Sequence, residues 1–221
     1  LEFGYWFTSC PIIAITGTNG KTTTTKLTNS VVSTTYSSNT FGNIGTPLSL
    51  AHSCDLDYLV CEVSSFQMEC VETFKPDISI ILNLAEDHID RHKTFDNYIN
   101  CKLNMLKNNT SKSITILNGD DNLLLSKTKG VKGKVYYFSK YGKVKGVYLL
   151  NNKIYSNVNG RDEELFSLNE IENLHNVLEN TLASILVGEL LKVGRDKILE
   201  ALKKFEFSSH RLEIVYQKEN V

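Results

Sequence analysis

Short apolar, β-branched runs alternate with amphipathic stretches through the first half of the chain. A strand followed by a glycine-rich turn predicts a helix over residues 21–32, and apolar residues at helical spacing predict one over residues 94–106. Four compact runs predict buried strands, at residues 11–16, 58–63, 77–84 and 113–118. This alternation favours an α/β fold in which a mostly parallel sheet is flanked by helices.

The second half of the chain has a different pattern of hydrophobic and polar residues. Several short strand-like runs fall between residues 131 and 168, two of them separated by Asn151 and Asn152, which suit a tight hairpin turn. This segment is predicted to form a small antiparallel β subdomain. Helical patterns return at 175–191 and 196–205, and the chain closes on a strand-like run at 210–217.

Composition and charge narrow the class of protein. The 221 residues are 41% hydrophobic and 22% charged, with a net charge of −1. These values are ordinary for a globular protein and provide no basic surface for nucleic acid or for a membrane. No apolar run is long enough to span a bilayer, and residues 1–10 lack the pattern of a signal peptide. The five cysteines form no C-x-x-C pair, which predicts free thiols and a cytosolic protein.

The segment AITGTNGKTT, at residues 14–23, is the main candidate for a phosphate-binding loop. The common loop G-x-x-x-x-G-K-[ST] would require glycine at Ile15, whereas this chain places it at Gly17, three residues before Gly20. A strand, a glycine-rich turn and a helix aim backbone N–H groups at phosphate oxygens. Lys21 would meet the β- and γ-phosphates, and Thr22 would offer its hydroxyl to Mg²⁺. The alternative is an ordinary strand-to-helix turn.

Two further segments carry candidate chemistry at predicted strand ends. Glu62 lies in CEVSSFQME, where a carboxylate can reach a metal held by a nucleotide; the alternative is an ordinary surface carboxylate. The segment NLAEDHIDRH, at residues 83–92, contains two aspartates and two histidines that could form a metal or proton-transfer cluster. His92 is read as an ordinary structural histidine.

The spacing G-T-N-G-K-[ST]-T resembles the loop of the Mur ligase and folylpolyglutamate synthetase superfamily of ATP-dependent amide-forming enzymes. E-V-S-S-F-Q at 62–67 and D-H-I-D-R at 87–91 are similar to its D-glutamate-adding members. The resemblance implies that residues 11–215 are a central ATPase domain. It also implies that residues 1–10 are a remnant of an N-terminal UDP-sugar domain and that the C-terminal ligase domain is absent.

The resemblance assigns roles to single residues. It implies nucleotide binding by Gly17, Thr18, Asn19, Gly20, Lys21, Thr22, Thr23, Asn176, Asn180 and Arg211. It implies catalytic roles for Lys21, Glu62, His88 and Lys102, and two Mg²⁺ sites involving Thr22, Glu62, His88 and Lys102. It implies acceptor-substrate contacts for Asn43, in the G-N-I-G-x-P loop, and for Ser64, Gln67 and His88.

Read alone, Lys102 would be a solvated helix lysine on the same face as Tyr98, whereas the resemblance implies a CO₂-derived carbamate on its side chain. Asn176 and Asn180 are expected on one helical face at the adenine. Their spacing of four residues, where the family shows three, leaves the partner of Asn180 open.

The implied function is ATP-dependent addition of D-glutamate to UDP-N-acetylmuramoyl-L-alanine through an acyl phosphate, in bacterial cytoplasmic peptidoglycan precursor synthesis. The isolated chain is expected to be monomeric and inactive, with no nucleic-acid or membrane partner. One alternative is another amide ligase, such as the folylpolyglutamate type, which S-S-F-Q disfavours. The other is a nucleotide-binding module without turnover, which would not need Glu62, His88 and Lys102.

Overall fold

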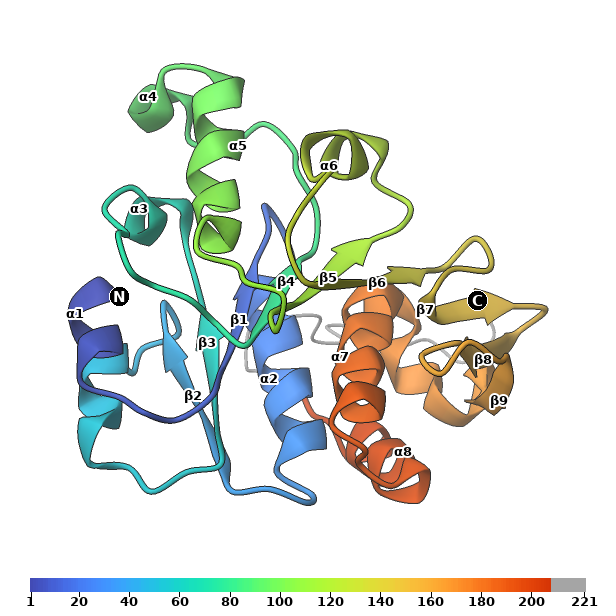
Figure 1. Ribbon diagram of the computed structural model, residues 1–221. Coiled ribbons are helices and arrows are strands. Elements are labelled where there is room, and N and C mark those ends of the chain that lie inside the picture. Colours follow the sequence, from blue (N-terminus) through green and yellow to red (C-terminus); the bar gives the residue numbers. More distant parts are fainter. Residues whose placement is uncertain (208–221) are drawn as a thin grey trace, which may run out of the picture.

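The computed structural model describes residues 1–207, so Arg211 and the predicted strand at 210–217 lie outside the described residues. A single nine-stranded sheet runs through the molecule in the order β2-β3-β1-β4-β5-β6-β7-β8-β9 (Figure 1). The strands are β1 (Ile12–Thr16), β2 (Ser38–Gly42), β3 (Tyr58–Glu62), β4 (Ile78–Ile81), β5 (Ile114–Asn118), β6 (Lys134–Ser139), β7 (Gly146–Leu150), β8 (Lys153–Ser156) and β9 (Glu163–Ser167).

Helices connect these strands and cover the sheet. The α-helices are α1 (Glu2–Trp6), α2 (Lys21–Val32), α3 (Ser65–Met68), α4 (Ile89–His92), α5 (Phe95–Leu103), α6 (Asn122–Lys127), α7 (Leu178–Leu190) and α8 (Arg195–Lys203). The 3₁₀ segments are η1 (Leu48–Ser53), η2 (Asn104–Leu106) and η3 (Leu168–Val177). None of the helices within residues 1–207 is long and apolar enough to cross a membrane.

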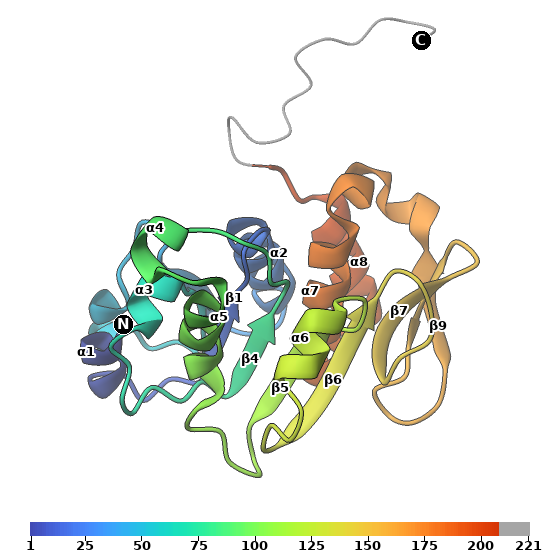
Figure 2. The same cartoon turned by 90° about the horizontal axis from the view of Figure 1, so that it is seen from above.

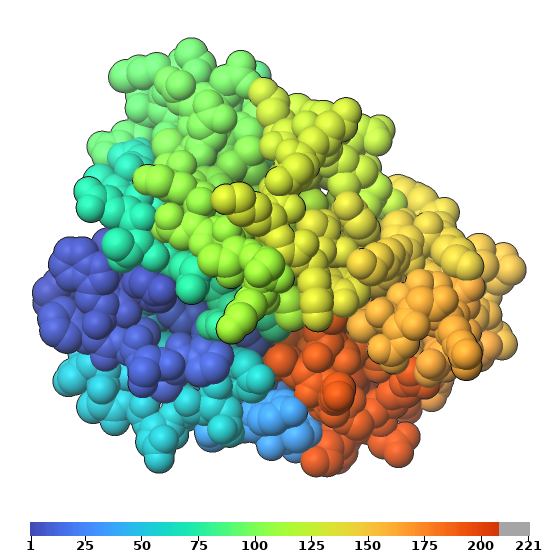
Figure 3. All heavy atoms as spheres, in the orientation of Figure 1, coloured from blue at the N-terminus to red at the C-terminus, as the bar shows by residue number. Residues whose placement is uncertain are grey.

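The sheet separates two hydrophobic cores. Because side chains alternate along a strand, Ile13 and Ile15 of β1 pack toward α2, α7 and α8, whereas Ile12 and Ala14 pack toward η1 and α5. Figures 1 and 2 show α5 and α6 on one side of the sheet and α2, α7 and α8 on the other. Figure 3 shows the N-terminal residues at one end of the molecule and the segment that includes β7–β9 at the opposite end. The architecture is the predicted helix–sheet–helix sandwich.

Because their strands run in the same direction, the loops that follow β1, β3 and β4 all lie at the carboxyl ends of the strands. The pairings β2–β3, β3–β1, β1–β4 and β4–β5 are all parallel. The chain leaves β1 toward β2 on one side, and leaves β4 toward β5 on the other. In such a sheet, ligands bind beyond the carboxyl ends of the strands at the point where the winding reverses. The predicted phosphate loop follows β1 at this point.

The segment at 131–168 differs from the prediction of a small antiparallel subdomain. β6 pairs parallel to β5, and β7 pairs parallel to β6, so both continue the main sheet. Only the β7–β8 and β8–β9 pairings are antiparallel. The turn at Asn151 and Asn152 is confirmed, with φ values of 49° and 62° that suit a two-residue hairpin. Strand pattern alone does not reveal the direction of a distant partner.

The predicted helix at 175–191 is interrupted. Val177 has φ −129° and ψ 32°, so η3 ends there and α7 begins at Leu178. Asn176 and Asn180 therefore belong to different helical segments, which corrects the expectation that one helix carries both. The structure also contains β2, whose residues are mostly polar, and α6, which at six residues is too short to show a helical repeat, so the apolar pattern predicted neither.

Candidate active site

The phosphate loop is built from the end of β1 and the start of α2. Gly20 caps the helix at φ 84°, a left-handed conformation that favours glycine. A Cβ atom there would also lie 2.2 Å from Nδ2 of Asn180. Nζ of Lys21 donates to the carbonyl oxygens of Gly17 at 2.9 Å and Thr18 at 2.8 Å, so this side chain folds back over the loop. Thr22 and Thr23 occupy the first turn of α2 and are half-buried.

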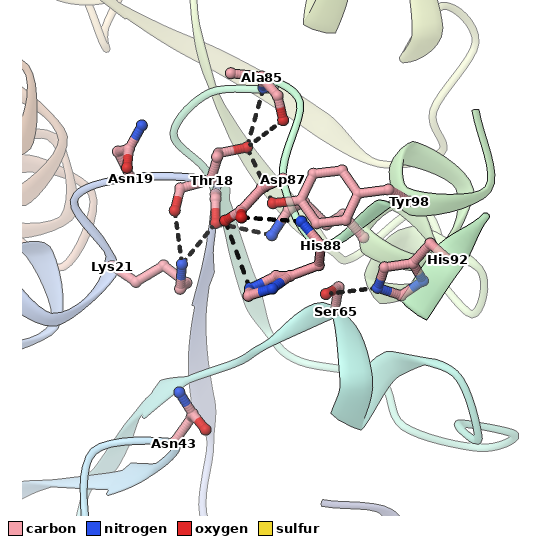
Figure 4. A network of polar contacts seen from close by, with 12 residues as sticks. Thr18, Asn19, Lys21, Asn43, Ser65, Ala85, Asp87, His88, His92 and Tyr98 are labelled. Atoms are coloured by element: carbon pink, nitrogen blue, oxygen red, sulfur yellow. Dashed lines mark hydrogen bonds and ion pairs between the residues drawn. The ribbon is translucent and has the colours of Figure 1, made fainter. Parts of the chain in front are cut away.

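The loop is fastened to the segment that follows β4. The hydroxyl of Thr18 donates to the carbonyl of Ala85 at 3.1 Å and accepts from the N–H of Ala85 at 3.0 Å. The hydroxyl of Tyr98, on α5, donates to the hydroxyl oxygen of Thr18 at 3.1 Å. The side-chain amide of Asn83 forms hydrogen bonds with the backbone N–H and carbonyl of Asn19. Figure 4 shows Thr18 and Lys21 beside His88 and Tyr98, with Asn43 approaching from a separate loop.

Lys102 is buried, contrary to the reading of the residue alone as a solvated helix lysine. Its side chain lies on α5 and the residue is 1% exposed. Nζ donates to the carbonyl of Gly17 at 2.8 Å and lies 4.6 Å from the centre of the Tyr98 ring. Burial, with a smaller contribution from the nearby charge of Lys21, lowers the pKa of Lys102 to about 7. A substantial fraction of this amine is therefore neutral near neutral pH.

Glu62, at the end of β3, is a buried carboxylate with one unpaired oxygen. The residue is 2% exposed, and its Oε1 accepts from Nδ2 of Asn43 at 3.0 Å. Its Oε2 is buried and has no hydrogen-bond partner among the described residues. Val60 packs toward α2, so the alternation along β3 directs Glu62 to the face where Thr22 lies. An orphaned buried oxygen of this kind is suited to a cation.

His88 and His92 have different environments. His88, at φ 51°, has a half-exposed side chain with Nε2 3.5 Å from Asp87. His92 is 6% exposed, and its Nε2 lies 3.1 Å from the hydroxyl of Ser65. His92 therefore has the structural setting predicted for it. The aspartates and histidines of this segment do not form one cluster, because residues 1–207 contain no group of three or more His, Cys, Asp or Glu side chains arranged to hold a metal.

A pocket of about 160 Å³ brings together five of the predicted site residues: Lys21, Asn43, Ser64, His88 and Lys102. Its lining consists of Lys21, Asn43, Ser64, Ser65, Phe66, His88, Tyr98 and Lys102. Gln67 does not line this pocket. Its N–H donates to the hydroxyl of Ser64 and its Oε1 accepts from the N–H of Ser64, which makes a capping box at the start of α3. Gln67 thus has a structural role, and its signal is the capping-box spacing of S-S-F-Q, in which Gln67 follows Ser64 by three residues.

A second pocket, of about 250 Å³, lies at the junction of η3 and α7. It is lined by Lys140, His175, Asn176, Val177, Leu178, Glu179 and Asn180. Asn176 and Asn180 face the same cavity despite the break between their helices. Nδ2 of Asn180 donates to the carbonyl of Gly20 at 3.2 Å and to the hydroxyl of Thr24 at 2.8 Å, so this pocket borders the phosphate loop. Lys140, paired with Glu179 at 2.8 Å, was not predicted.

Comparison with known proteins agrees with this arrangement. Residues 15–188 match the model of the Mur ligase middle domain. The chain is 42% identical over 221 residues to the UDP-N-acetylmuramoylalanine--D-glutamate ligase of Thermoanaerobacter sp. (strain X514), covering 97% of this chain and 48% of that protein. The ligase of the same name from Fusobacterium nucleatum is 42% identical over 209 residues, covering 93% of this chain and 47% of that protein.

Solved structures show the same fold at lower identity. MurF from Acinetobacter baumannii superimposes with a TM-score of 0.71 at 20% identity, over 99% of this chain and 51% of that one. MurF ligase from Thermotoga maritima, solved in complex with ADP, gives a TM-score of 0.67 at 17% identity, over 94% of this chain and 51% of that one. The chain spans about half the length of the curated relatives it matches. It belongs to the Mur ligase middle-domain family.

Proposed function

We propose that this chain is the ATP-binding domain of a ligase that joins D-glutamate to UDP-N-acetylmuramoyl-L-alanine. The observation that carries the proposal is the meeting of Lys21 and Lys102 at the carbonyl of Gly17, in a pocket that also contains Asn43 and His88. A phosphate loop alone would need neither a buried second lysine nor these pocket residues. The names of the relatives support the choice of substrates.

ATP would place its polyphosphate at the start of α2 and its base in the second pocket. The first N–H groups of an α-helix have no intrahelical acceptor, so they are available to phosphate oxygens. Lys21 donates to loop carbonyls in this structure and would transfer these bonds to the phosphates. Asn176 and Asn180 line the cavity proposed for adenine. Arg211, proposed to contact ribose or phosphate, lies outside the described residues.

The donor set beside the pocket fits Mg²⁺; Glu62 does not line the pocket, but its Oε1 accepts from Asn43, which does. Glu62 contributes an unpaired buried oxygen, and Thr22 can contribute its hydroxyl from the same face of the sheet. A second ion would be held by His88 together with a carbamate on Lys102. Since the described residues contain no preformed cluster, phosphate and substrate oxygens would complete both coordination shells. Bound Mg²⁺ supplies charge neutralisation at the transferring phosphoryl group.

Carbamylation suits the position of Lys102. The neutral amine forms a bond to the carbon of CO₂ and releases a proton, which leaves an anionic carboxylate on the nitrogen. A lysine with a pKa of about 7 has neutral amine available, unlike an ordinary solvated lysine. Its negative charge would replace the positive charge of an ammonium beside Lys21. The modified side chain then becomes an oxygen ligand at the pocket.

The side chains around the pocket support a two-step reaction. The acceptor carboxylate would enter beside Asn43 and His88 and attack the γ-phosphorus of ATP, which breaks the bond to the β-phosphate, releases ADP and gives an acyl phosphate. The amine of D-glutamate would then displace phosphate and form the amide bond. Lys21 would stabilise the negative charge that develops on the phosphoryl oxygens in the first step. Ser64 lies in the lining of the same pocket and is a further candidate for contact with the acceptor.

The remaining parts of the proposal concern the whole protein. Residues 11–215 would be the central domain, flanked by a UDP-sugar domain, of which residues 1–10 are part, and by a C-terminal domain that binds the amino acid. We propose a bacterial cytoplasmic enzyme that acts as a monomer, with no nucleic-acid or membrane partner. The chain alone would bind Mg²⁺-ATP without forming product.

One experiment with two arms tests this function. Calorimetric titration of this chain with Mg²⁺-ATP should show one site, and Lys21→Ala should abolish the heat without unfolding the protein. In the longer polypeptide that includes the flanking domains, phosphate release should require both UDP-N-acetylmuramoyl-L-alanine and D-glutamate. Release with a folate and glutamate would instead indicate the folylpolyglutamate type. Nucleotide binding with no acceptor-dependent release would indicate a binding module.

A further inference from the structure

Asn83, which follows β4, holds the phosphate loop through its side-chain amide. Its Oδ1 accepts from the backbone N–H of Asn19 at 2.9 Å, and its Nδ2 donates to the backbone carbonyl of Asn19 at 3.2 Å. The two bonds close a ring in which the side chain of Asn83 pairs with both polar groups of one loop residue. Only a side chain with a donor and an acceptor side by side can make this pair.

This contact extends the pairing of β1 and β4 beyond the ends of the strands. Leu82 donates its N–H to the carbonyl of Thr16 at 3.0 Å, and Thr18 donates its N–H to the carbonyl of Asn83 at 3.1 Å. The side chain of Asn83 adds the next rung, at Asn19. Asn83 lies beyond the end of β4, and its side chain, not its backbone, supplies the partner for Asn19.

The contacts of Asn83 determine which N–H groups of the phosphate loop remain available to a ligand. The N–H groups of Thr18 and Asn19 are directed to Asn83. Phosphate would therefore be bound mainly by the first turn of α2 and by Lys21. At the other end of the loop, Nδ2 of Asn180 donates to the carbonyl of Gly20 at 3.2 Å. Two asparagine side chains thus hold the loop from opposite ends.

We propose that Asn83 is a positioning residue that fixes the phosphate loop in its binding conformation before the nucleotide arrives. It acts through Asn19 and does not touch the phosphates. Without this side chain the loop samples other conformations, and part of the binding free energy is used to order it. The first test below needs no nucleotide, and only the second rests on the proposed function.

The first test measures amide hydrogen exchange in the unliganded chain. In Asn83→Ala, the amide of Asn19 should exchange about tenfold faster or more, since its acceptor is removed. The amides of Ile13 and Ile15 in β1 should keep their rates. The matched control is Asn100→Ala, which removes an exposed asparagine of α5 and should change neither set. Unchanged exchange at Asn19 in a folded Asn83→Ala protein would overturn the proposal.

The second test compares ligands with and without phosphates. Asn83→Ala should lower the affinity of the chain for ATP and for ADP by a similar factor, about tenfold, and leave its affinity for adenosine unchanged. An equal loss for adenosine, or unchanged ATP affinity, would count against positioning of the loop. If the unmodified chain binds no nucleotide, the proposed function fails, and the exchange measurement still decides the role of Asn83.

Discussion

Lys21 and Lys102 share one acceptor, the carbonyl oxygen of Gly17, to which their Nζ atoms donate at 2.9 Å and 2.8 Å. The two lysines are 81 positions apart, and α5 carries the second one over the loop that precedes the first. Each positive charge disfavours the other, and this repulsion is the second cause, after burial, of the low pKa of Lys102. The pocket is thus prepared for an anionic group.

The low pKa of Lys102 predicts a stability that rises with pH. The unfolded chain holds this proton up to the ordinary pKa of 10.5, whereas the folded protein releases it near pH 7. The unfolded state therefore binds more protons between these values, and the free energy of unfolding should rise by up to about 1.4 kcal/mol per pH unit across them. Below pH 7 both states are protonated and this contribution is flat.

Urea unfolding in CO₂-free buffer at pH 7, 8 and 9 measures this effect. The comparison is with Lys102→Met, which keeps an unbranched side chain one atom shorter and removes the titrating group. The free energy of unfolding of the unmodified chain, relative to that of the variant, should increase as the pH rises. A difference that stays constant would show that Lys102 titrates in the folded protein as it does in the unfolded one.

Carbamylation of Lys102 can be observed directly. With ¹³C-labelled CO₂ at pH 8, the unmodified chain should give a carbamate resonance in its ¹³C spectrum, because the neutral amine is the reactive form. Lys102→Gln should remove it, whereas Lys107→Gln, at an exposed lysine nearby, should leave it. A spectrum with no such resonance in the unmodified chain would contradict the proposed modification of this residue.

Glu62→Gln is predicted to weaken the effect of Mg²⁺ on nucleotide binding. Gln can still accept from Asn43, but it places a neutral amide where the unpaired oxygen lies. The improvement in ATP affinity on adding Mg²⁺ should fall roughly tenfold, equivalent to about 1.4 kcal/mol of lost coordination. Binding with the metal chelated should not change.

Titrations with Mg²⁺ and with a chelator separate these two quantities. The matched control is Glu69→Gln, which alters a carboxylate that Arg91 holds on the surface at 2.8 Å. That variant should keep the full effect of Mg²⁺. An undiminished effect of Mg²⁺ in Glu62→Gln would place the ion elsewhere.

The parts of the fold that the sequence predicted are those with local signals. The apolar run of β1, the turn of glycines and the amphipathic face of α2 are contiguous, so their order along the chain already specifies the phosphate loop. The directions of β6 and β7 depend on partners elsewhere in the chain: both were placed in a separate antiparallel unit, whereas β6 pairs parallel with β5 and with β7, and only β7 continues into the antiparallel pairing with β8. Pattern alone does not encode this pairing.

The candidate site also combines residues that have a local sequence signal with residues whose setting depends on distant parts of the chain. Gly17 and Lys21 are found by their spacing, whereas the burial of Lys102 arises only when α5 packs over the loop. Local chemistry reads this lysine as exposed, and only the resemblance to a family suggested otherwise. Asn83 left no signal, because its partners are backbone atoms of Asn19, and backbone atoms are the same in every residue.

Gly20→Ala tests the packing between the loop and α7. The new methyl group would lie 2.2 Å from Nδ2 of Asn180, in a residue with φ 84°. The backbone conformation alone costs about 1–2 kcal/mol, and the overlap adds about 1–3 kcal/mol more. The control is Gly130→Ala, which has φ 78° and no atom within 4 Å of the new methyl group. It should show the backbone cost only.

A double-mutant cycle separates the two contributions. Asn180→Ala alone loses the bonds to Gly20 and Thr24, at a cost of about 1–2 kcal/mol. Combined with Gly20→Ala, it also removes the overlap, so the pair should be less destabilised than the sum of the single variants by about 1–2 kcal/mol in urea unfolding. Strict additivity would mean that Asn180 moves aside at no cost. The close contact would then have no part in holding the loop.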